Sequence, residues 1–114
     1  MTISSLDAAR AHVAAALAKL IDNGDDSESV AYTLKQHGIT GQRGNCKICP
    51  IAVFLCKQLS DDFTTIAVQR YGVSLIVDTD AGQRHLEMQL PGGITNFINM
   101  FDDRHTWHPE LAVS

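Results

Sequence analysis

Long hydrophobic runs are missing from this sequence of 114 residues. No apolar run is longer than six residues, the length of Ile51–Cys56, whereas a membrane-spanning helix needs about 20. The N-terminus also lacks the pattern of a secretory signal, because Asp7 precedes its apolar part and Arg10 and Lys19 interrupt it. We therefore expect a cytoplasmic protein that makes no contact with membranes.

Cysteine is scarce as well. The three cysteines (Cys46, Cys49 and Cys56) are an odd number in a chain without an export signal, which indicates free thiols in a reducing compartment. Cys46-x-x-Cys49 has the spacing of half a zinc site, but a structural site needs four ligands and no second pair exists. If residues 49–56 are helical, the Cα atoms of Cys49 and Cys56 lie about 10.5 Å apart, too far for one zinc ion. The sequence therefore predicts no bound metal and no other cofactor.

Acidic side chains are missing from residues 29–60, although the whole chain is acidic, with 9 basic and 13 acidic residues and a net charge of −4. That segment alone carries +4, from Lys35, Arg43, Lys47 and Lys57. The nucleotide-binding pattern Gly-x-x-x-x-Gly-Lys-Ser/Thr is absent. The overall charge gives no reason to expect DNA or an anionic membrane as partner. Weak, salt-sensitive binding of nucleic acid or phosphate by residues 35–57 stays open as an alternative.

Two helices are predicted in the first third of the chain. Hydrophobic residues recur at steps of three and four over residues 4–22, which is typical of an amphipathic helix. Ser4 and Asp7 have the spacing of a capping box at its start. A second helix is predicted from Ser27 to His37, and we expect Tyr32 to be among its inward-facing side chains.

Glycine and proline mark the boundaries of two further helices. Gly38 follows the second helix where a C-terminal cap glycine belongs. After a glycine-containing loop, a third helix is predicted over Pro50–Leu59, because proline suits the first helical position. It is the most apolar of the chain, so we expect it at the centre of the fold. A fourth helix is predicted over Pro91–Asp103, before an irregular tail (residues 104–114).

The hydrophobic period changes to two between the third and fourth helices. This predicts three strands, Thr64–Gln69, Val73–Thr79 and Arg84–Leu90. The links Arg70-Tyr71-Gly72 and Asp80-Ala81-Gly82 have hairpin-turn compositions and are too short for parallel crossovers. We therefore predict a single α+β domain over residues 1–114. It has three N-terminal helices, a three-stranded antiparallel meander and a C-terminal helix, with the helices packed on one face of the sheet.

Three short motifs carry a resemblance to known proteins. They are a Gly-x-x-Gly loop, a Cys-Pro-Ile-Ala-x-Phe-Leu helix start and a Phe-Asp…Pro-x-Leu ending. In this respect residues 41–111 resemble a group of small proteins of actinomycetes and their phages. The matching positions are Gly41, Gly44, Cys49, Pro50, Ile51, Ala52, Phe54, Leu55, Phe101, Asp102, Pro109 and Leu111. Because no function is assigned to that group, the resemblance implies a shared fold and no activity.

The candidate binding residues lie in the loop that leads into the third predicted helix and at the start of that helix. They are Arg43, Gly44, Cys46, Lys47 and Cys49. A cysteine at a helix N-terminus is expected to have a lowered pKa, and Lys47 adds a nearby positive charge. Cys46 could then serve as a resolving thiol. The competing interpretation is that Cys49 is a small buried residue at the start of the helix and that Cys56 belongs to the core.

No catalytic residues can be assigned, because no Ser/His/Asp arrangement and no facing pair of carboxylates can be placed. An enzyme is therefore less expected than a binding protein. The first hypothesis is a small cytoplasmic interaction or regulatory module, such as a phage accessory protein, that binds a protein partner. A thiol-dependent redox protein using Cys46 and Cys49 is one alternative. The weak nucleic-acid or phosphate binder described above is the other.

Overall fold

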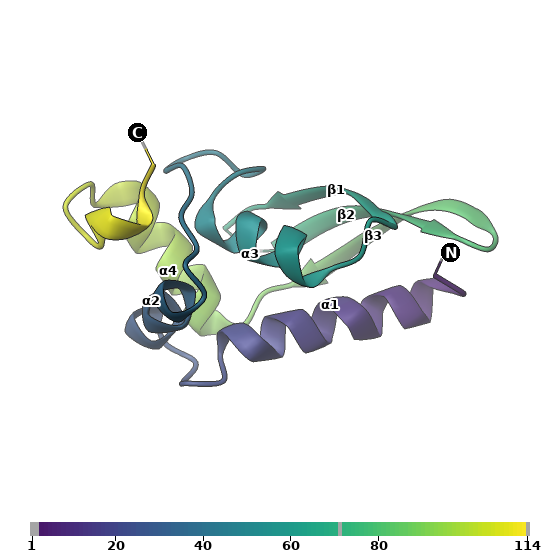
Figure 1. Cartoon of the computed structure of the whole chain (residues 1–114), viewed down its shortest axis with the longest axis horizontal. Coiled ribbons are helices and arrows are strands. Elements are labelled where there is room, and N and C mark those ends of the chain that lie inside the picture. Colours follow the sequence, from purple (N-terminus) through teal and green to yellow (C-terminus); the bar gives the residue numbers. More distant parts are fainter. Residues whose placement is uncertain (1–2, 71, 114) are drawn as a thin grey trace.

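The computed structural model describes residues 3–70 and 72–113. These residues form four α-helices and one three-stranded antiparallel sheet (Figure 1). In chain order the elements are α1 (Leu6–Leu20), α2 (Ser27–Gln36), α3 (Pro50–Gln58), β1 (Phe63–Val68), β2 (Gly72–Thr79), β3 (Gly82–Gln89), α4 (Gly92–Asp103) and a short 3-10 helix, η1 (Pro109–Leu111). The predicted α+β fold is confirmed.

The first helix begins one residue later than the predicted capping box requires. Ser5 is the N-cap of α1, and its hydroxyl accepts a hydrogen bond from the Ala8 amide (3.1 Å). The assignment of Ser4 as the cap was therefore wrong, although the helix itself is present. Ser5 takes this role because its extended backbone (φ −155°) turns its side chain toward the free amides of the first turn.

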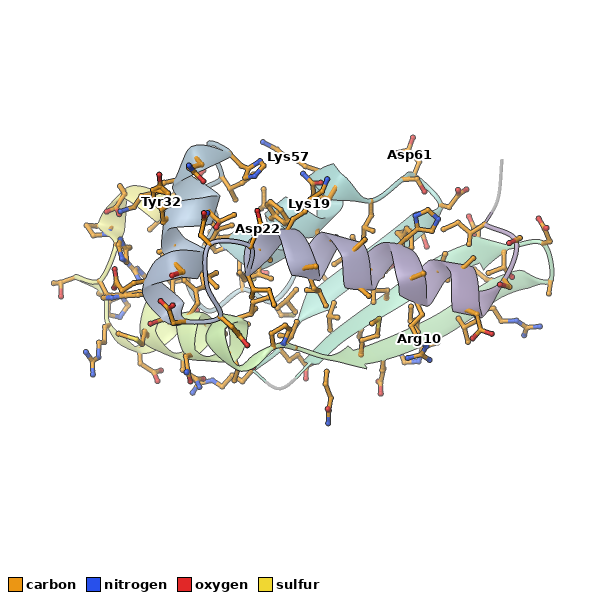
Figure 2. The ribbon with its side chains drawn as sticks, turned by 90° about the horizontal axis from the view of Figure 1, so that it is seen from below. Arg10, Lys19, Asp22, Tyr32, Lys57 and Asp61 are labelled. Atoms are coloured by element: carbon orange, nitrogen blue, oxygen red, sulfur yellow. The ribbon has the colours of Figure 1, made fainter. Side chains whose placement is uncertain are left out.

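The end of α2 follows the glycine signal in the sequence. Gly38 has φ +66°, its amide bonds to the Lys35 carbonyl (3.1 Å), and the Ile39 amide bonds to the Leu34 carbonyl (3.0 Å). These two bonds make a Schellman motif, and Ile39 is buried beside it. Tyr32, by contrast, was wrongly predicted to face inward. It is 51% exposed on the outer side of α2 (Figure 2), because the neighbouring positions on either side already supply the buried stripe.

The sheet is a meander in the order β1-β2-β3. On β2, Val73, Leu75 and Val77 are buried, whereas the residues that alternate with them are only half-buried. The buried face packs against helices, since α1 contacts β3 and α3 contacts β1 (Figure 1). The hairpin between β1 and β2 is closed by a bond from the Gln69 amide to the Gly72 carbonyl (2.8 Å). Tyr71, in the predicted turn, lies outside the described residues.

The helices α2 and α4 pack side by side beyond one end of the sheet (Figure 1). The apolar stripe of α4 is buried as its spacing predicts, with Phe97 and Phe101 at its centre. The segment after α4 is less irregular than predicted, because it includes η1 and a parallel β-bridge between Ala112 and Gly41. Within the described ranges, no helix has the length and apolar character to cross a membrane.

Candidate functional site

The loop before α3 is held by backbone hydrogen bonds on two sides. Gly41 makes two hydrogen bonds with the C-terminal segment. Its amide donates to the Leu111 carbonyl (2.9 Å), and its carbonyl accepts from the Val113 amide (3.0 Å). On its other side, the Gln42 amide bonds to the Ile48 carbonyl (2.8 Å). The loop backbone is therefore held on both sides by bonds within the protein.

The tip of this loop is a tight turn over residues 45–48. The Ile48 amide bonds to the Asn45 carbonyl (3.3 Å), and the Asn45 side chain accepts a bond from the Lys47 amide (3.1 Å). Such side-chain bonds to the backbone stabilise turns. Cys46, Lys47 and Ile48 are exposed on this turn, and Ile48 is one of few large apolar side chains in the described ranges with such exposure (42%).

Arg43 points away from the turn and contacts the C-terminal end of α4. Its guanidinium donates hydrogen bonds to the backbone carbonyls of Phe101, Arg104 (3.2 Å) and Trp107 (2.8 Å). It also lies 4.1 Å from the centre of the Phe101 ring. The last carbonyls of a helix lack partners within the helix, and a cation is favoured at that end. Arg43 therefore caps α4. One feature of the sequence is consistent with this role. The last turn of α4 has no basic residue of its own, so a cation from elsewhere can occupy that position.

Gly44 and Asp102 make a second link between the loop and α4. The Gly44 amide donates to an Asp102 carboxylate oxygen (2.9 Å). Gly44 has φ +69°, which favours glycine, although a Cβ there would meet no atom within 4 Å. Glycine is thus needed for its backbone conformation and not for space.

Cys49 is the N-cap residue of α3, and its sulfur accepts a bond from the Ala52 amide (3.5 Å). The side chain is buried, with 6% of its surface exposed. Burial raises the pKa of the Cys49 thiol to about 11, despite the opposing effect of the Ala52 and Ile51 amides. The lowered pKa expected at a helix N-terminus is therefore reversed, because desolvation outweighs the hydrogen bonds. The thiol is protonated at neutral pH.

The other two cysteines are exposed. Cys46 lies on the exposed turn. Cys56 was expected in the core and this was wrong, because the inward side of α3 is taken by Ile51, Ala52, Phe54 and Leu55.

A hollow of about 170 Å³ lies beside this helix entrance. Three segments distant in the sequence line it, namely residues 44–46 with Cys49, residues 68–70 at the end of β1, and Ile98 and Asp102 of α4. Cys46 and Cys49 both belong to its wall. The walls are joined by a bond from the Val68 amide to the Cys46 carbonyl (2.8 Å). The hollow is therefore framed by fixed backbone contacts.

Two of the four cations in the basic segment are used inside the molecule. Lys35 forms an ion pair with Glu110 (2.6 Å), and Arg43 caps α4. Lys47 and Lys57 are exposed. The charge available to a ligand is therefore smaller than the sequence count of +4 indicates.

A serine, a histidine and a glutamate meet on the outer face of the sheet, which the sequence reasoning missed. The Ser74 hydroxyl lies 3.3 Å from His85 Nε2 and donates to Glu87 Oε1 (3.2 Å). A relay that activates serine requires the acid on the other ring nitrogen, Nδ1. Here both groups contact the same hydroxyl, and Glu87 lies nearest Nε2 (3.7 Å). The cluster is therefore a cross-strand polar contact. His85 pairs with Ile76, two residues from Ser74 on the neighbouring strand. The cluster could therefore have been predicted only once the strand register was known.

The structure brings three of the five predicted binding residues, Gly44, Cys46 and Cys49, to the hollow. Lys47 lies on the adjoining turn, and Arg43 is directed to α4. Their part in binding a partner stays a prediction. In the described ranges, no group of three or more His, Cys, Asp or Glu side chains is placed to hold a metal ion. No protein-family model, curated protein or solved structure matches the chain.

The thiols should differ sharply in reactivity. In the native protein near neutral pH we expect iodoacetamide to alkylate Cys46 and Cys56 readily. Cys49 should react at least about 100-fold more slowly, because its side chain is buried and little of its thiol is ionised. Peptide mass spectrometry after timed quenching measures the three rates. In urea the rates should converge, and native alkylation of Cys49 at the rate of Cys46 would contradict the expectation.

Proposed function

We propose that this domain is an interaction module that binds a protein partner at the entrance of α3. The observation that supports it most is the pre-formed turn at residues 45–48. Its backbone is fixed by internal bonds, and it presents Cys46, Lys47 and the apolar Ile48 to solvent beside a hollow. A binding loop that is rigid before association loses less conformational entropy when it binds.

The division of labour within the loop supports the same proposal. Arg43, Gly44 and Cys49 make contacts that hold the loop in place. The Asn45 side chain also belongs to that framework, through its bond from the Lys47 amide. The side chains of Cys46, Lys47 and Ile48 are exposed to solvent. Loops that a rigid scaffold positions are common sites of binding. We include in the proposal that the domain is a cytoplasmic accessory protein of an actinomycete or its phage, the source of the proteins that its motifs resemble.

The two alternatives have less support. A redox role would need a reactive thiolate, and the Cys49 thiol has its pKa raised to about 11. A nucleic-acid or phosphate role would draw on four cations, two of which already have partners within the molecule.

Affinity capture with matched variants tests the proposal. The tagged protein, an Ile48→Asp variant and a Tyr32→Asp variant are each incubated with lysate of an actinomycete host, and bound proteins are quantified by mass spectrometry. Tyr32 is the control, since it is also a large exposed side chain but lies on α2. We expect the wild type and the Tyr32 variant to capture one protein in near-stoichiometric amounts. Ile48→Asp should lower the amount of that protein captured at least about tenfold.

Equal recovery with all three proteins, or recovery of none, would count against the proposal. A Cys46→Ser variant separates the redox alternative from it. Removing one sulfur on the turn should leave capture intact if the domain acts by binding, whereas a thiol-dependent activity would be lost.

A further inference from the structure

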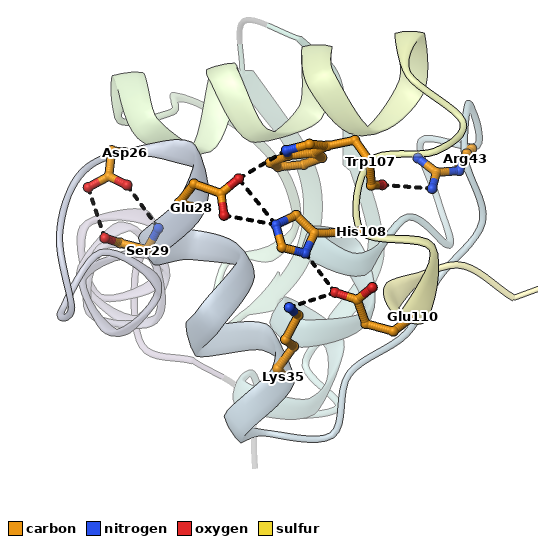
Figure 3. Close-up of polar contacts among 8 residues, drawn as sticks. All are labelled: Asp26, Glu28, Ser29, Lys35, Arg43, Trp107, His108 and Glu110. Carbon is orange, nitrogen blue, oxygen red and sulfur yellow. Dashed lines mark hydrogen bonds and ion pairs between the residues drawn. The ribbon is translucent and has the colours of Figure 1, made fainter.

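The segment after α4 is tied to α2 by a cluster of polar side chains (Figure 3). The Trp107 indole nitrogen donates to Glu28 Oε1 (3.0 Å), and His108 Nε2 lies 3.0 Å from Glu28 Oε2. On its other side, His108 Nδ1 lies 2.6 Å from Glu110 Oε1. Lys35 of α2 pairs with the same Glu110 oxygen (2.6 Å). Glu28 and Glu110, about 80 positions apart in the sequence, thus share one imidazole between them.

His108 is held in an unusual backbone conformation at the centre of this cluster. Among residues 3–70 and 72–113 it is the one non-glycine residue with a positive φ (φ 46°, ψ 57°). Such a conformation costs about 1–2 kcal/mol in a non-glycine residue and persists where surrounding contacts compensate. The side chain is only 16% exposed, and its ring meets the Trp107 ring edge-on at 4.5 Å.

Both ring nitrogens of His108 face carboxylate oxygens. A neutral imidazole has one N–H and one lone pair, whereas the charged form has two N–H groups. Both contacts are therefore hydrogen bonds only when the ring carries its second proton. In that state, the charges of His108 and Lys35 balance those of Glu28 and Glu110. Loss of the proton leaves a net negative cluster with a lone pair against a carboxylate.

We propose that residues 104–113 form a pH-dependent strap, closed while His108 is charged and loosened when His108 loses its proton. The groups that face His108 are Glu28 and Lys35 of α2, Glu110 of η1 and the Trp107 ring, which itself packs on Phe97 of α4 (5.4 Å). The strap covers part of the core, since Leu111 is buried (1% exposed). It also holds Gly41 through the bridge at Ala112.

The Glu110 side of the strap withstands mild acid. The Lys35 hydrogen bond, and then that of His108, lowers the pKa of Glu110 from 4.5 to about 2. A group with a lowered pKa contributes stability above its unfolded value, and the contribution is lost as the pH falls through the folded value. Glu110 therefore continues to hold the strap in mildly acidic solution.

The single tryptophan of the chain is Trp107, so its fluorescence reports on the strap. The full-length protein is titrated from about pH 5 to about pH 9, across the range in which histidine changes its charge. We expect the acrylamide quenching constant of Trp107 to rise about twofold and its emission to shift to longer wavelength as the half-buried ring becomes more exposed. Amide exchange at Leu111–Val113, corrected for intrinsic rates, should become roughly tenfold faster because a charge-assisted contact is lost.

Two variants test whether His108 is responsible. His108→Asn tolerates the left-handed backbone and does not titrate, so quenching should no longer depend on pH. Glu28→Gln can donate to a neutral ring nitrogen, so the change should become smaller. His12→Asn, on the exposed side of α1, is the control and should keep the full response. An unchanged response in both test variants, or quenching and exchange in the wild type that do not depend on pH, would overturn the proposal.

Discussion

Gly41→Ala is expected to destabilise the fold by about 3 kcal/mol or more, a large fraction of the stability of a small domain. A Cβ at this position would lie 2.4 Å from Pro50 N, 2.5 Å from the Cys49 carbonyl carbon and 2.6 Å from Ile48 O. All three are backbone atoms, so no side-chain rotation can relieve the clash. The chain would have to move at the start of α3 or give up the bridge to Ala112.

Far-UV circular dichroism during urea unfolding measures this loss, and two other glycines supply matched controls. Gly92 lies in the first turn of α4 with no atom within 4 Å of a Cβ and no positive φ, so Gly92→Ala should be neutral or stabilising by up to about 1 kcal/mol. Gly44 has open space but φ +69°, so Gly44→Ala should cost about 1–2 kcal/mol. A Gly41 variant no less stable than the Gly44 variant would show that the loop can relax.

Local patterns predicted most of the fold, because their physical causes lie within a few residues of one another. Gly38 and Ile39 form the Schellman motif with carbonyls three to five residues earlier. Pro50 starts α3 because its missing amide hydrogen costs nothing at that position. The strand period and the short links determine an antiparallel meander, since no crossover helix fits between the strands. Each of these features needs no knowledge of distant contacts.

The site depends on contacts between distant residues, and these could not be predicted in the same way. The sequence places Arg43 in a basic segment, yet its partners are carbonyls of residues 58 to 64 positions further along. The direction of the Cys49 pKa shift depends on the burial of its side chain in the hydrophobic core, and spacing along the chain does not reveal that burial. The strap joins Glu28 to His108 across 80 positions. Spacing along the chain carries no information about such pairs.

Arg43→Met is expected to lower the free energy of unfolding by about 3 kcal/mol, although Arg43 appears in the sequence as a surface cation. The substitution removes donors from the carbonyls of Phe101 and Arg104 at the end of α4 and from the Trp107 carbonyl in the segment that follows. Hydrogen bonds to charged groups contribute about 1.5–3 kcal/mol each, without simple additivity. It also removes the contact with the Phe101 ring. Arg43→Lys should recover less than half of the loss, because an ammonium group lacks the planar fork that reaches several acceptors at once.

Lys57→Met is the matched control, since Lys57 is a cation of the same segment that is exposed on α3, and its loss should change stability by less than about 0.5 kcal/mol. Urea unfolding of the three variants measures the difference. The comparison also separates two interpretations of the basic segment. If Arg43 instead bound an anionic ligand, its removal would weaken the binding of that ligand and leave the stability near that of the Lys57 variant. The geometry leads to the opposite expectation, in which stability falls and the remaining exposed cations determine any affinity for anions.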